Sequence, residues 1–289
     1  MRLFMSRLKS RSAEAFREAL GTLSEAHCEA SDRMDDGTPI CVSCDREGDR
    51  LRIDFRGSGP VHKGNLNATS AIVHSAVIYV LRLLAGRDLP LNEGLLQHVS
   101  LRIPHGILAP PFPACAEECP PVVGGNVETS QRVVDVLLTA LGRAACSQGT
   151  MNNVTFGNDR FSCYETIGGG AGACASGAGC SAVHVHMTNT AITDPEVMEV
   201  RMPVRLEQFA IRRGSGGAGE HRGGDGVVRQ IRFLEPVEVS LLTQRRVQGP
   251  PGAAGGGAGL AGHQHVVRSD GTTEALGFVA AARLQAGDA

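Results

Sequence analysis

One apolar stripe near the middle of the chain constrains the fold most strongly. Val133, Val134, Leu137, Leu138 and Leu141 recur at steps of three and four residues. This spacing places all five side chains on one face of an α-helix. The sequence therefore predicts a helix here whose apolar face is buried.

Polar residues stand at the beginning of this helix. Asn126, Thr129 and Ser130 are candidate caps for its first amide groups, and Glu128 lies where the positive end of the helix dipole favours a negative charge. Capping alone is one interpretation of these residues. Contact with a substrate is the other, and it depends on the segment that follows the helix.

That following segment is rich in side chains that form hydrogen bonds without carrying charge. They are Gln148, Thr150, Asn152, Asn153, Thr155 and Asn158. Amides and hydroxyls of this kind suit a dry pocket for a neutral amide or carbonyl substrate, because each unpaired polar group in such a pocket would be costly. A hydrogen-bonded network that braces glycine-rich turns is the alternative, and composition does not separate the two.

Four strings of residues in this part of the chain resemble the hydantoinase B family. They are Gly-Gly-Asn-Val-Glu-Thr-Ser-Gln-Arg-Val-Val-Asp, Ser-Gln-Gly-Thr-Met-Asn-Asn-Val-Thr, Tyr-Glu-Thr-Ile-Gly-Gly-Gly-Ala-Gly and His184 to Pro195. The resemblance runs in the same order from about Asp35 to the end of the chain. Within the family it is most similar to the carboxy-terminal half of ATP-hydrolysing 5-oxoprolinases.

The resemblance implies an ATP-dependent cyclic amide hydrolase that opens 5-oxo-L-proline to L-glutamate, a step of the γ-glutamyl cycle of glutathione metabolism. It also implies magnesium and potassium, and a hydantoinase A-type partner, fused or separate, that binds the ATP. A five-membered lactam is a resonance-stabilised amide, so phosphorylation of its oxygen supplies a leaving group and an electrophilic carbon. The implied ligand of this chain is a small cyclic amide, with ATP bound mainly elsewhere.

The chemistry of ring opening suggests roles for particular residues. Glu128 and Glu165 are the predicted acid and base. The predicted substrate contacts, which would donate hydrogen bonds to the tetrahedral centre, are Asn126, Thr129, Asn152, Asn153, Thr155, Gly169 and Gly170. We expect these groups to line one cavity, formed where the segment after the helix folds back toward the amino end of the helix.

Two histidines are candidate metal ligands. Residues Ser181 to Asn189 predict a strand in which His184 and His186 point to one face. At a rise of about 3.3 Å per residue their imidazoles would lie about 7 Å apart, close enough to share a metal or contact an anion. A pair of structural histidines is the alternative, because the sequence offers no evident third ligand.

Alternatives to the 5-oxoprolinase hypothesis stay open. We expect the chain to lack the amino-terminal portion in which relatives such as acetone carboxylase carry Asp and His metal ligands, and to lack the glycine-rich end of the family. Residues Ala173 to Cys180 also depart from the family pattern. An N-methylhydantoinase or acetone carboxylase-type subunit is one alternative. A truncated, catalytically silent protein that binds at the subunit interface of the family is the other.

The nine cysteines are odd in number and spread along the chain, which favours free thiols in a reducing compartment. Cys41 and Cys44 together with Cys115 and Cys119 have spacings found in zinc sites. However, Cys41 and Cys44 lie in a predicted strand, where a separation of three residues places them on opposite faces. Buried thiols are therefore the favoured interpretation.

Composition points away from several classes of partner. The net charge is −2 and 20% of the residues are charged, which does not suggest nucleic acid. The chain has neither 18 consecutive apolar residues nor a secretory signal, so we expect a cytoplasmic protein without a membrane segment. The glycine-rich stretch from Arg212 to Gly226 lacks the Gly-Lys-Ser/Thr of a phosphate-binding loop. A homo-oligomer stays open.

The remaining patterns predict an α+β fold of mixed helices and antiparallel-rich sheets, with a strand- and glycine-rich carboxy-terminal half. The predicted helices are Ser12 to Ala30 and a helix from Thr69 to Gly86 that Asn65 and Asn67 cap. The predicted strands are Thr38 to Cys44, Leu51 to Phe55, His98 to Pro104, Val227 to Leu234 and Val237 to Thr243. The proline-rich connection from Ala109 to Pro121 divides an amino-terminal region, 1–121, from the predicted core of the hydantoinase B-type domain, 122–289.

Overall fold

A computed structural model describes residues 2–23 and 26–289 of the chain. These residues form two units, Met1–Arg143 and Ala144–Ala289. The proline-rich connection Ala109 to Pro121 lies inside the first unit and is irregular, as predicted, apart from one short 3₁₀ turn. The predicted division of the chain at residue 121 stays a prediction.

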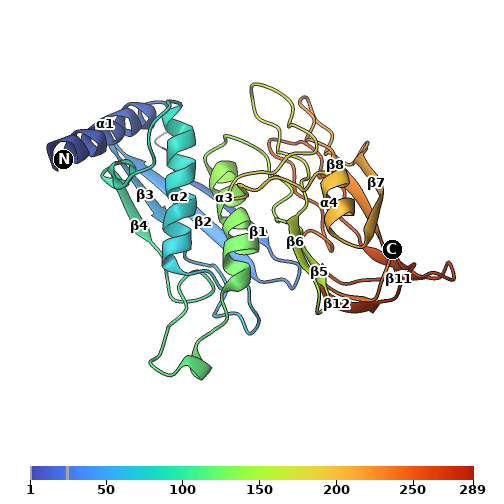
Figure 1. The fold of residues 1–289 in the computed structure, drawn as a ribbon. Helices are drawn as coiled ribbons and strands as arrows, with labels where there is room; N and C mark the ends of the chain where they lie inside the picture. The colour runs from blue at the N-terminus through green and yellow to red at the C-terminus, as the bar shows by residue number, and fades with distance from the viewer. Residues whose placement is uncertain (1, 24–25) are drawn as a thin grey trace. The chain divides into compact units, whose positions relative to one another are not determined.

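The first unit is built on a four-stranded sheet with helices on one of its faces (Figure 1). Its strands are β1 (Cys28–Arg33), β2 (Pro39–Glu47), β3 (Arg50–Asp54) and β4 (Val99–Arg102). Its helices are α1 (Arg2–Leu20), α2 (Ser70–Ala85), the 3₁₀ helices η1 (Glu93–Leu96) and η2 (Ala116–Glu118), the π-helical turn η3 (Gly125–Thr129) and α3 (Ser130–Ala140).

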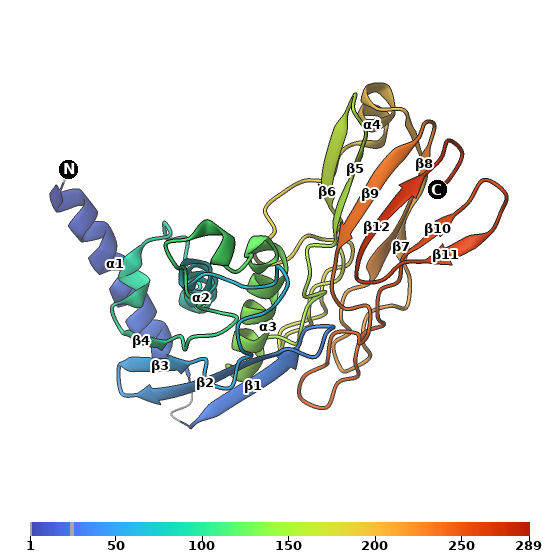
Figure 2. The same ribbon diagram turned by 90° about the horizontal axis from the view of Figure 1, so that it is seen from below.

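The sheet has the order β1-β2-β3-β4, with antiparallel pairs at β1/β2 and β2/β3 and a parallel pair at β3/β4. Every second residue of β2 from Ile40 to Cys44 is buried, and Ile40, Val42 and Cys44 face the core. Helices α2 and α3 cover this face (Figure 2). The predicted strands Thr38 to Cys44 and Leu51 to Phe55 are confirmed as β2 and β3, which pair as a hairpin. Alternation of apolar and polar residues selects a half-buried strand.

The predicted helix Ser12 to Ala30 was wrong at both ends. Helix α1 begins at Arg2 and ends at Leu20, and Cys28 already belongs to β1. Phe16 and Leu20 of this helix are buried. The residues from Cys28 onward instead pair in register with β2, so a long-range strand pairing overrides the local helical pattern.

Helix α2 confirms the predicted helix before Gly86, with a different cap. Thr69 is the N-cap, and its side chain accepts a hydrogen bond from the amide of Ile72. Gly86 ends the helix in the left-handed conformation, with φ of 59°. Asn67 is instead fully buried, and its Nδ2 donates to the carbonyl oxygens of His62, Gly64 and Pro121.

Helix α3 confirms the central apolar stripe, but its predicted caps were wrong. The π-helical turn η3 runs directly into α3, so Thr129 already has helical dihedral angles and its side chain makes no cap hydrogen bond. The Thr129 hydroxyl donates instead to the carbonyl oxygen of Leu66, and the Ser130 hydroxyl donates to that of Asn126. These hydroxyls connect the turn to neighbouring backbone.

The second unit is rich in strands and glycine, as predicted. Its elements are β5 (Asn153–Gly157), β6 (Ser162–Thr166), α4 (Pro195–Arg201), β7 (Val204–Arg212), β8 (Gly226–Phe233), β9 (Val237–Leu242), β10 (His265–Val267), β11 (Thr273–Ala275) and β12 (Val279–Leu284). Strands β12-β9-β5-β6 form an antiparallel sheet, and β7/β8 and β10/β11 form separate antiparallel pairs. The overall class is α+β.

One face of the β12-β9-β5-β6 sheet carries the core of the second unit. Phe156, Cys163 and Val239 point into it, and Met198 of α4 and Phe233 of β8 pack against them. The rings of Phe156 and Phe233 meet edge to face with centroids 5.3 Å apart. This packing fixes which residues of β5 and β6 point away from the core.

Glycine-rich segments between the strands pack backbone against backbone. The amide of Gly224 donates to the carbonyl oxygen of Ala171 at 2.9 Å, and that of Gly223 donates to Gly217 at 3.0 Å. A Cβ atom on Gly170 would lie 1.9 Å from the carbonyl oxygen of Gly224. Only glycine permits so close an approach. The glycine-rich stretch from Arg212 to Gly226 therefore packs its backbone closely against neighbouring segments.

The predicted strand from Ser181 to Asn189 was wrong. The described residues there form one isolated bridge, between Val183 and Gly169. Ala182 and His186 have φ of 55° and 50°. These left-handed conformations are incompatible with a continuous pleated strand, so the alternating placement of side chains that the prediction assumed does not arise.

Candidate functional site

A stripe of buried polar residues runs along η3 and α3 in the first unit. Glu128, Gln131, Arg132 and Asp135 are spaced three and four residues apart, which aligns them on one side of a helix. None of the four is more than 1% exposed. Buried charges are retained where they are paired or functional, so this stripe is the candidate functional site of the first unit.

Arg132 is a residue of this stripe that sequence reasoning did not single out. Its guanidinium is fully buried, and Nη1 lies 2.7 Å from Oδ2 of Asp32 and 3.1 Å from the carbonyl oxygen of Arg33. The pair joins α3 to β1 across 100 positions of sequence. The four-residue spacing from Glu128 was the available signal, because it places both charges on one helix face.

The other predicted residues of this region differ in their exposure. Thr129 is buried, and its hydroxyl lies 2.5 Å from the carbonyl oxygen of Leu66. Asn126 is exposed, although it belongs to the same turn. A π-helical turn is rare and is found often at functional sites, so the conformation of this turn supports the choice of Glu128 independently of its burial.

In the second unit, Asn152 and Asn153 lie at the beginning of β5. Asn152 has φ of 50°, its Nδ2 donates to the carbonyl oxygen of Ile167 at 3.1 Å, and its Oδ1 accepts from Nη2 of Arg246 at 2.8 Å. Asn153 is buried, its Nδ2 donates to Leu242 at 2.8 Å, and its Oδ1 accepts from the hydroxyl of Tyr164 at 2.6 Å. Both side-chain amides therefore brace the backbone.

Strand register separates the predicted residues of the second unit into two groups. Thr155 lies opposite Tyr164, and Val154 lies opposite Glu165. Asn153, Thr155 and Tyr164 therefore share one face of the sheet, and Glu165 lies on the other face with Val154. A single small substrate held against Asn153 and Thr155 does not contact Glu165.

Glu165 is saturated with hydrogen bonds on its own face. Nε and Nη2 of Arg229 both donate to Oε2, at 3.1 Å and 2.9 Å, and Oε1 accepts from Nη2 and from the amide of Thr193, each at 3.2 Å. Both side chains are at least 97% buried. A carboxylate has about four lone-pair positions for hydrogen bonds, and all four are used here. This geometry favours a structural role for Glu165.

Of the two predicted glycine donors, Gly169 already uses its amide. The Gly169 amide donates to the carbonyl oxygen of Val183 at 3.0 Å. The carbonyl oxygen of Gly170 accepts from the amide of Gln148 at 2.9 Å. Oε1 of Gln148 is buried and has no hydrogen-bond partner among the described residues. It packs against Gly169, where an added Cβ would lie 1.7 Å from it.

His184 and His186 do not have the geometry that suggested a metal pair. His184 lies in an irregular segment and His186 in a turn, so neither belongs to a strand, and burial lowers the pKa of His184. Across residues 2–23 and 26–289 no group of three or more His, Cys, Asp and Glu side chains is arranged to hold a metal ion. The predicted metal site therefore has no support from the fold.

The predicted site residues divide between the two units. Asn126, Glu128 and Thr129 belong to the first, and the predicted residues from Asn152 to His186 belong to the second. The hypothesis that they line one cavity joins the units and stays a prediction. In the described part of the chain, no helix combines the length and the apolar character needed to cross a membrane.

Comparisons with known proteins identify a family model and several relatives that match most or all of the sequence. A family model described as Hydantoinase B/oxoprolinase matches residues 1–289. The chain is 48% identical over 262 residues to 5-oxoprolinase 1 of Arabidopsis thaliana, a match that covers 90% of this chain and 20% of that protein. It is 47% identical over 245 residues to 5-oxoprolinase of Dictyostelium discoideum, covering 84% of this chain and 19% of that protein.

Solved structures are similar in fold. The ATP-dependent caprolactamase of Pseudomonas jessenii superimposes with a TM-score of 0.82 and 20% identity, over 99% of this chain and 53% of that chain. A nucleotide-free acetone carboxylase superimposes with a TM-score of 0.74 and 16% identity. The superposition covers 89% of this chain and 38% of that chain. The chain spans about a fifth of the length of the 5-oxoprolinases it matches. Because the family model matches all of residues 1–289, this chain belongs to the hydantoinase B/oxoprolinase family.

Proposed function

We propose that this chain is the part of an ATP-dependent 5-oxoprolinase-type hydrolase that helps open the cyclic amide of 5-oxo-L-proline to L-glutamate. The observation that carries the proposal is 48% identity to a 5-oxoprolinase over 90% of this chain. Because the chain spans 20% of that relative, the activity is proposed for the assembly in which the chain works. We place that assembly in the cytoplasm, since none of the nine cysteines forms a disulfide.

We assign ATP, magnesium and potassium to a hydantoinase A-type partner, fused or separate. The residues described here do not fit the nucleotide, since neither lysine of the sequence, Lys9 or Lys63, follows a glycine as in a phosphate-binding loop. They also offer no cluster of metal ligands. No step in this chain is therefore assigned to the nucleotide or to a metal ion.

Within this chain we propose Glu128 as the acid/base. It is fully buried on the π-helical turn, and one helical turn later comes Arg132, which Asp32 fixes in place. A carboxylate that is held rigidly and shielded from bulk water is suited to accept a proton from an attacking water and return it to the leaving nitrogen. Thr129 would act by fixing the turn through its bond to Leu66.

For the neutral ring we propose contacts from the second unit. Asn153 and Thr155 share a sheet face with the Tyr164 hydroxyl, and such groups recognise an amide without adding charge. Between the two glycines we favour the amide of Gly170 as a donor to the developing oxyanion, because Gly169 already bonds to Val183. Glu165 is proposed as the structural partner of Arg229, in place of the predicted acid/base role.

The decisive experiment measures glutamate and ADP formed from 5-oxoproline by this chain with a hydantoinase A-type partner. We expect ATP-dependent glutamate release, and a decrease of about 10²–10⁴-fold in kcat for Glu128→Gln. Thermal unfolding and partner binding of that variant should be unchanged. Glu238→Gln is the matched control, because the Glu238 side chain is 71% exposed.

Other results identify the alternatives. Undiminished turnover by Glu128→Gln would rule out the proposed acid/base. Turnover of N-methylhydantoin, or carboxylation of acetone, in place of 5-oxoproline hydrolysis would assign the chain to another activity of the superfamily. Intact partner binding without any product would identify a catalytically silent interface protein.

A further inference from the structure

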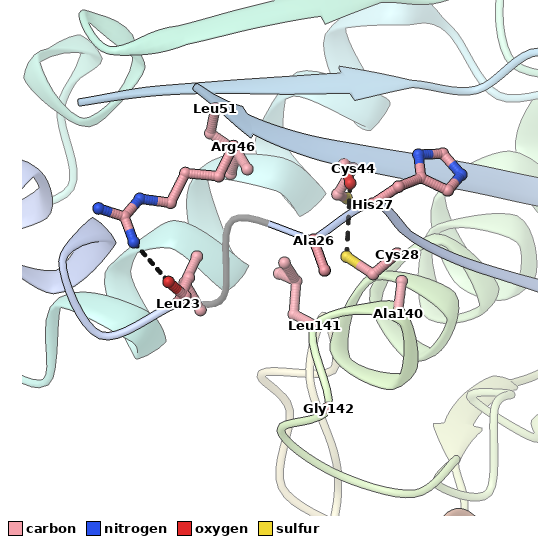
Figure 3. A pocket seen from close by; sticks show the side chains of 10 residues that line it. All are labelled: Leu23, Ala26, His27, Cys28, Cys44, Arg46, Leu51, Ala140, Leu141 and Gly142. Carbon is pink, nitrogen blue, oxygen red and sulfur yellow. Dashed lines mark hydrogen bonds between the residues drawn. The ribbon is translucent and has the colours of Figure 1, made fainter. Parts of the chain in front are cut away.

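A cavity of about 180 Å³ lies at the edge of the sheet in the first unit. It is lined on one side by Cys28 and Cys44 of the sheet and on the other by Ala140 and Gly142 at the end of α3. Figure 3 shows the sulfur of Cys28 directed toward the backbone of Cys44, with Ala140, Leu141 and Gly142 lining the same cavity. The cavity leaves open space beside the two cysteines.

The two cysteines are direct partners across the β1/β2 ladder. Cys28 pairs in register with Cys44, so their side chains leave the same face of the sheet. Paired antiparallel residues have Cα atoms roughly 4.5–5.5 Å apart, within the range of about 4.4–6.8 Å that a disulfide spans. Sγ of Cys28 lies 3.5 Å from the carbonyl oxygen of Cys44. The ladder therefore permits an S–S bond without movement of the backbone.

The surroundings of Cys28 favour its thiolate. The pKa of Cys28 is lowered to about 7, because its interaction with Cys44 and the charge of His27 outweigh burial and the charge of Asp45. His27 is held 2.6 Å from Oδ1 of Asp45, and this carboxylate raises the pKa of the imidazole. The interaction with Cys28, together with burial, raises the pKa of Cys44. Cys28 is thus the nucleophile of the pair, and Cys44 is its protonated neighbour.

We propose that Cys28 and Cys44 are a redox-active thiol pair, which hydrogen peroxide converts reversibly into a disulfide across β1 and β2. The Cys28 thiolate attacks one peroxide oxygen, the O–O bond breaks, and the leaving hydroxide takes up a proton to become water. The Cys28 sulfenic acid then reacts with the Cys44 thiol, forming the S–S bond and releasing a second water. Two thiols are oxidised by two electrons and one peroxide is reduced.

Peptide mapping of the full chain tests the proposal directly. The reduced protein is treated with peroxide, its remaining thiols are alkylated, and its peptides are analysed by mass spectrometry. We expect a linked Cys28–Cys44 peptide whose mass is about 2 Da below the sum of its reduced parts, and its loss after treatment with a dithiol reductant. Because the disulfide constrains the unfolded chain, the oxidised protein should also unfold at a higher temperature.

Three variants complete the test. Cys44→Ser should stop the reaction at Cys28 sulfenic acid, which dimedone traps, and Cys28→Ser should abolish the linked peptide. Cys41→Ser, on the opposite face of the same strand, should form the linked peptide like the wild type. The exposed Cys115 reports the oxidant dose in every sample. If Cys28 and Cys44 are still alkylated separately at a dose that fully oxidises Cys115, the proposal is wrong.

Discussion

Glu165 and Arg229 form a buried, two-pronged ion pair between β6 and β8, with Nη2 2.9 Å from Oε2 and Nε 3.1 Å from the same oxygen. Arg229 also lies over the ring of Phe209, 5.1 Å from its centroid. These contacts make the pair a structural connection of the second unit. The structural role that we propose for Glu165, in place of the predicted acid/base role, rests on these contacts.

Arg229→Met should destabilise the protein by about 3–5 kcal/mol, because it leaves the Glu165 carboxylate buried without its partner charge. Urea unfolding followed by circular dichroism measures the change. Arg283→Met is the control, since its pair with Glu238 is exposed and should contribute at most about 1 kcal/mol. Equal stability losses in both variants would contradict the structural role of the buried pair.

Gly170→Ala should destabilise the second unit by roughly 1–3 kcal/mol, because the new Cβ requires the glycine segments to move apart. That Cβ would otherwise lie 1.9 Å from the carbonyl oxygen of Gly224. Gly177→Ala is the matched control, because nothing lies within 4 Å of its Cβ position. Thermal unfolding distinguishes the variants, and a Gly170→Ala protein as stable as Gly177→Ala would refute close backbone packing.

Acid should remove the stabilising effect of Asp54. Burial raises the pKa of this carboxyl, but hydrogen bonds from the backbone and guanidinium of Arg56, together with the charge of Arg102, outweigh burial and lower it. A lowered pKa means that the stabilisation is complete above the unfolded value of about 3.9 and is lost as pH falls through the folded pKa.

Asp54→Asn should therefore cost about 2 kcal/mol at neutral pH, and the difference from wild type should shrink below the ordinary carboxyl pKa. Unfolding free energies measured in urea across this acid range provide the test. Asp159→Asn is the control, because Asp159 is exposed. The unfolding free energy of this variant should stay close to that of the wild type across the acid range. A difference between wild type and Asp54→Asn that is constant with pH would be inconsistent with a charge effect.

Asp194→Ala should cost about 1 kcal/mol through loss of a helix cap. Oδ1 of Asp194 accepts from the amides of Glu196 and Val197 at 3.0 Å and 3.2 Å, and Pro195 occupies the first turn of α4. Chemical unfolding measures the loss. Asp194→Ser preserves an acceptor oxygen and should restore most of the stability, and failure of that rescue would argue against capping.

The elements that were predicted correctly from sequence are those whose pattern is local. The stripe from Val133 to Leu141 requires only the period of a helix, and the β2/β3 hairpin requires only alternation. The family resemblance was also carried by contiguous strings of residues, and it is confirmed over the full chain. A pattern that lies within a few residues does not depend on what the rest of the chain does.

Tertiary structure decided the chemistry of individual side chains. Arg132 and Asp32 are 100 positions apart in the sequence, and Glu165 and Arg229 are 64 positions apart. No local sequence pattern therefore predicts either ion pair. The separation of Glu165 from Asn153 follows from the register of β5 and β6. A strand presents alternate residues to opposite faces, and only the pairing of distant segments determines which face is buried. For this protein, sequence alone determined the central helix α3, the strands β2 and β3 and the family, because their patterns are local. Long-range packing decided which charged side chains pair and which two thiols meet.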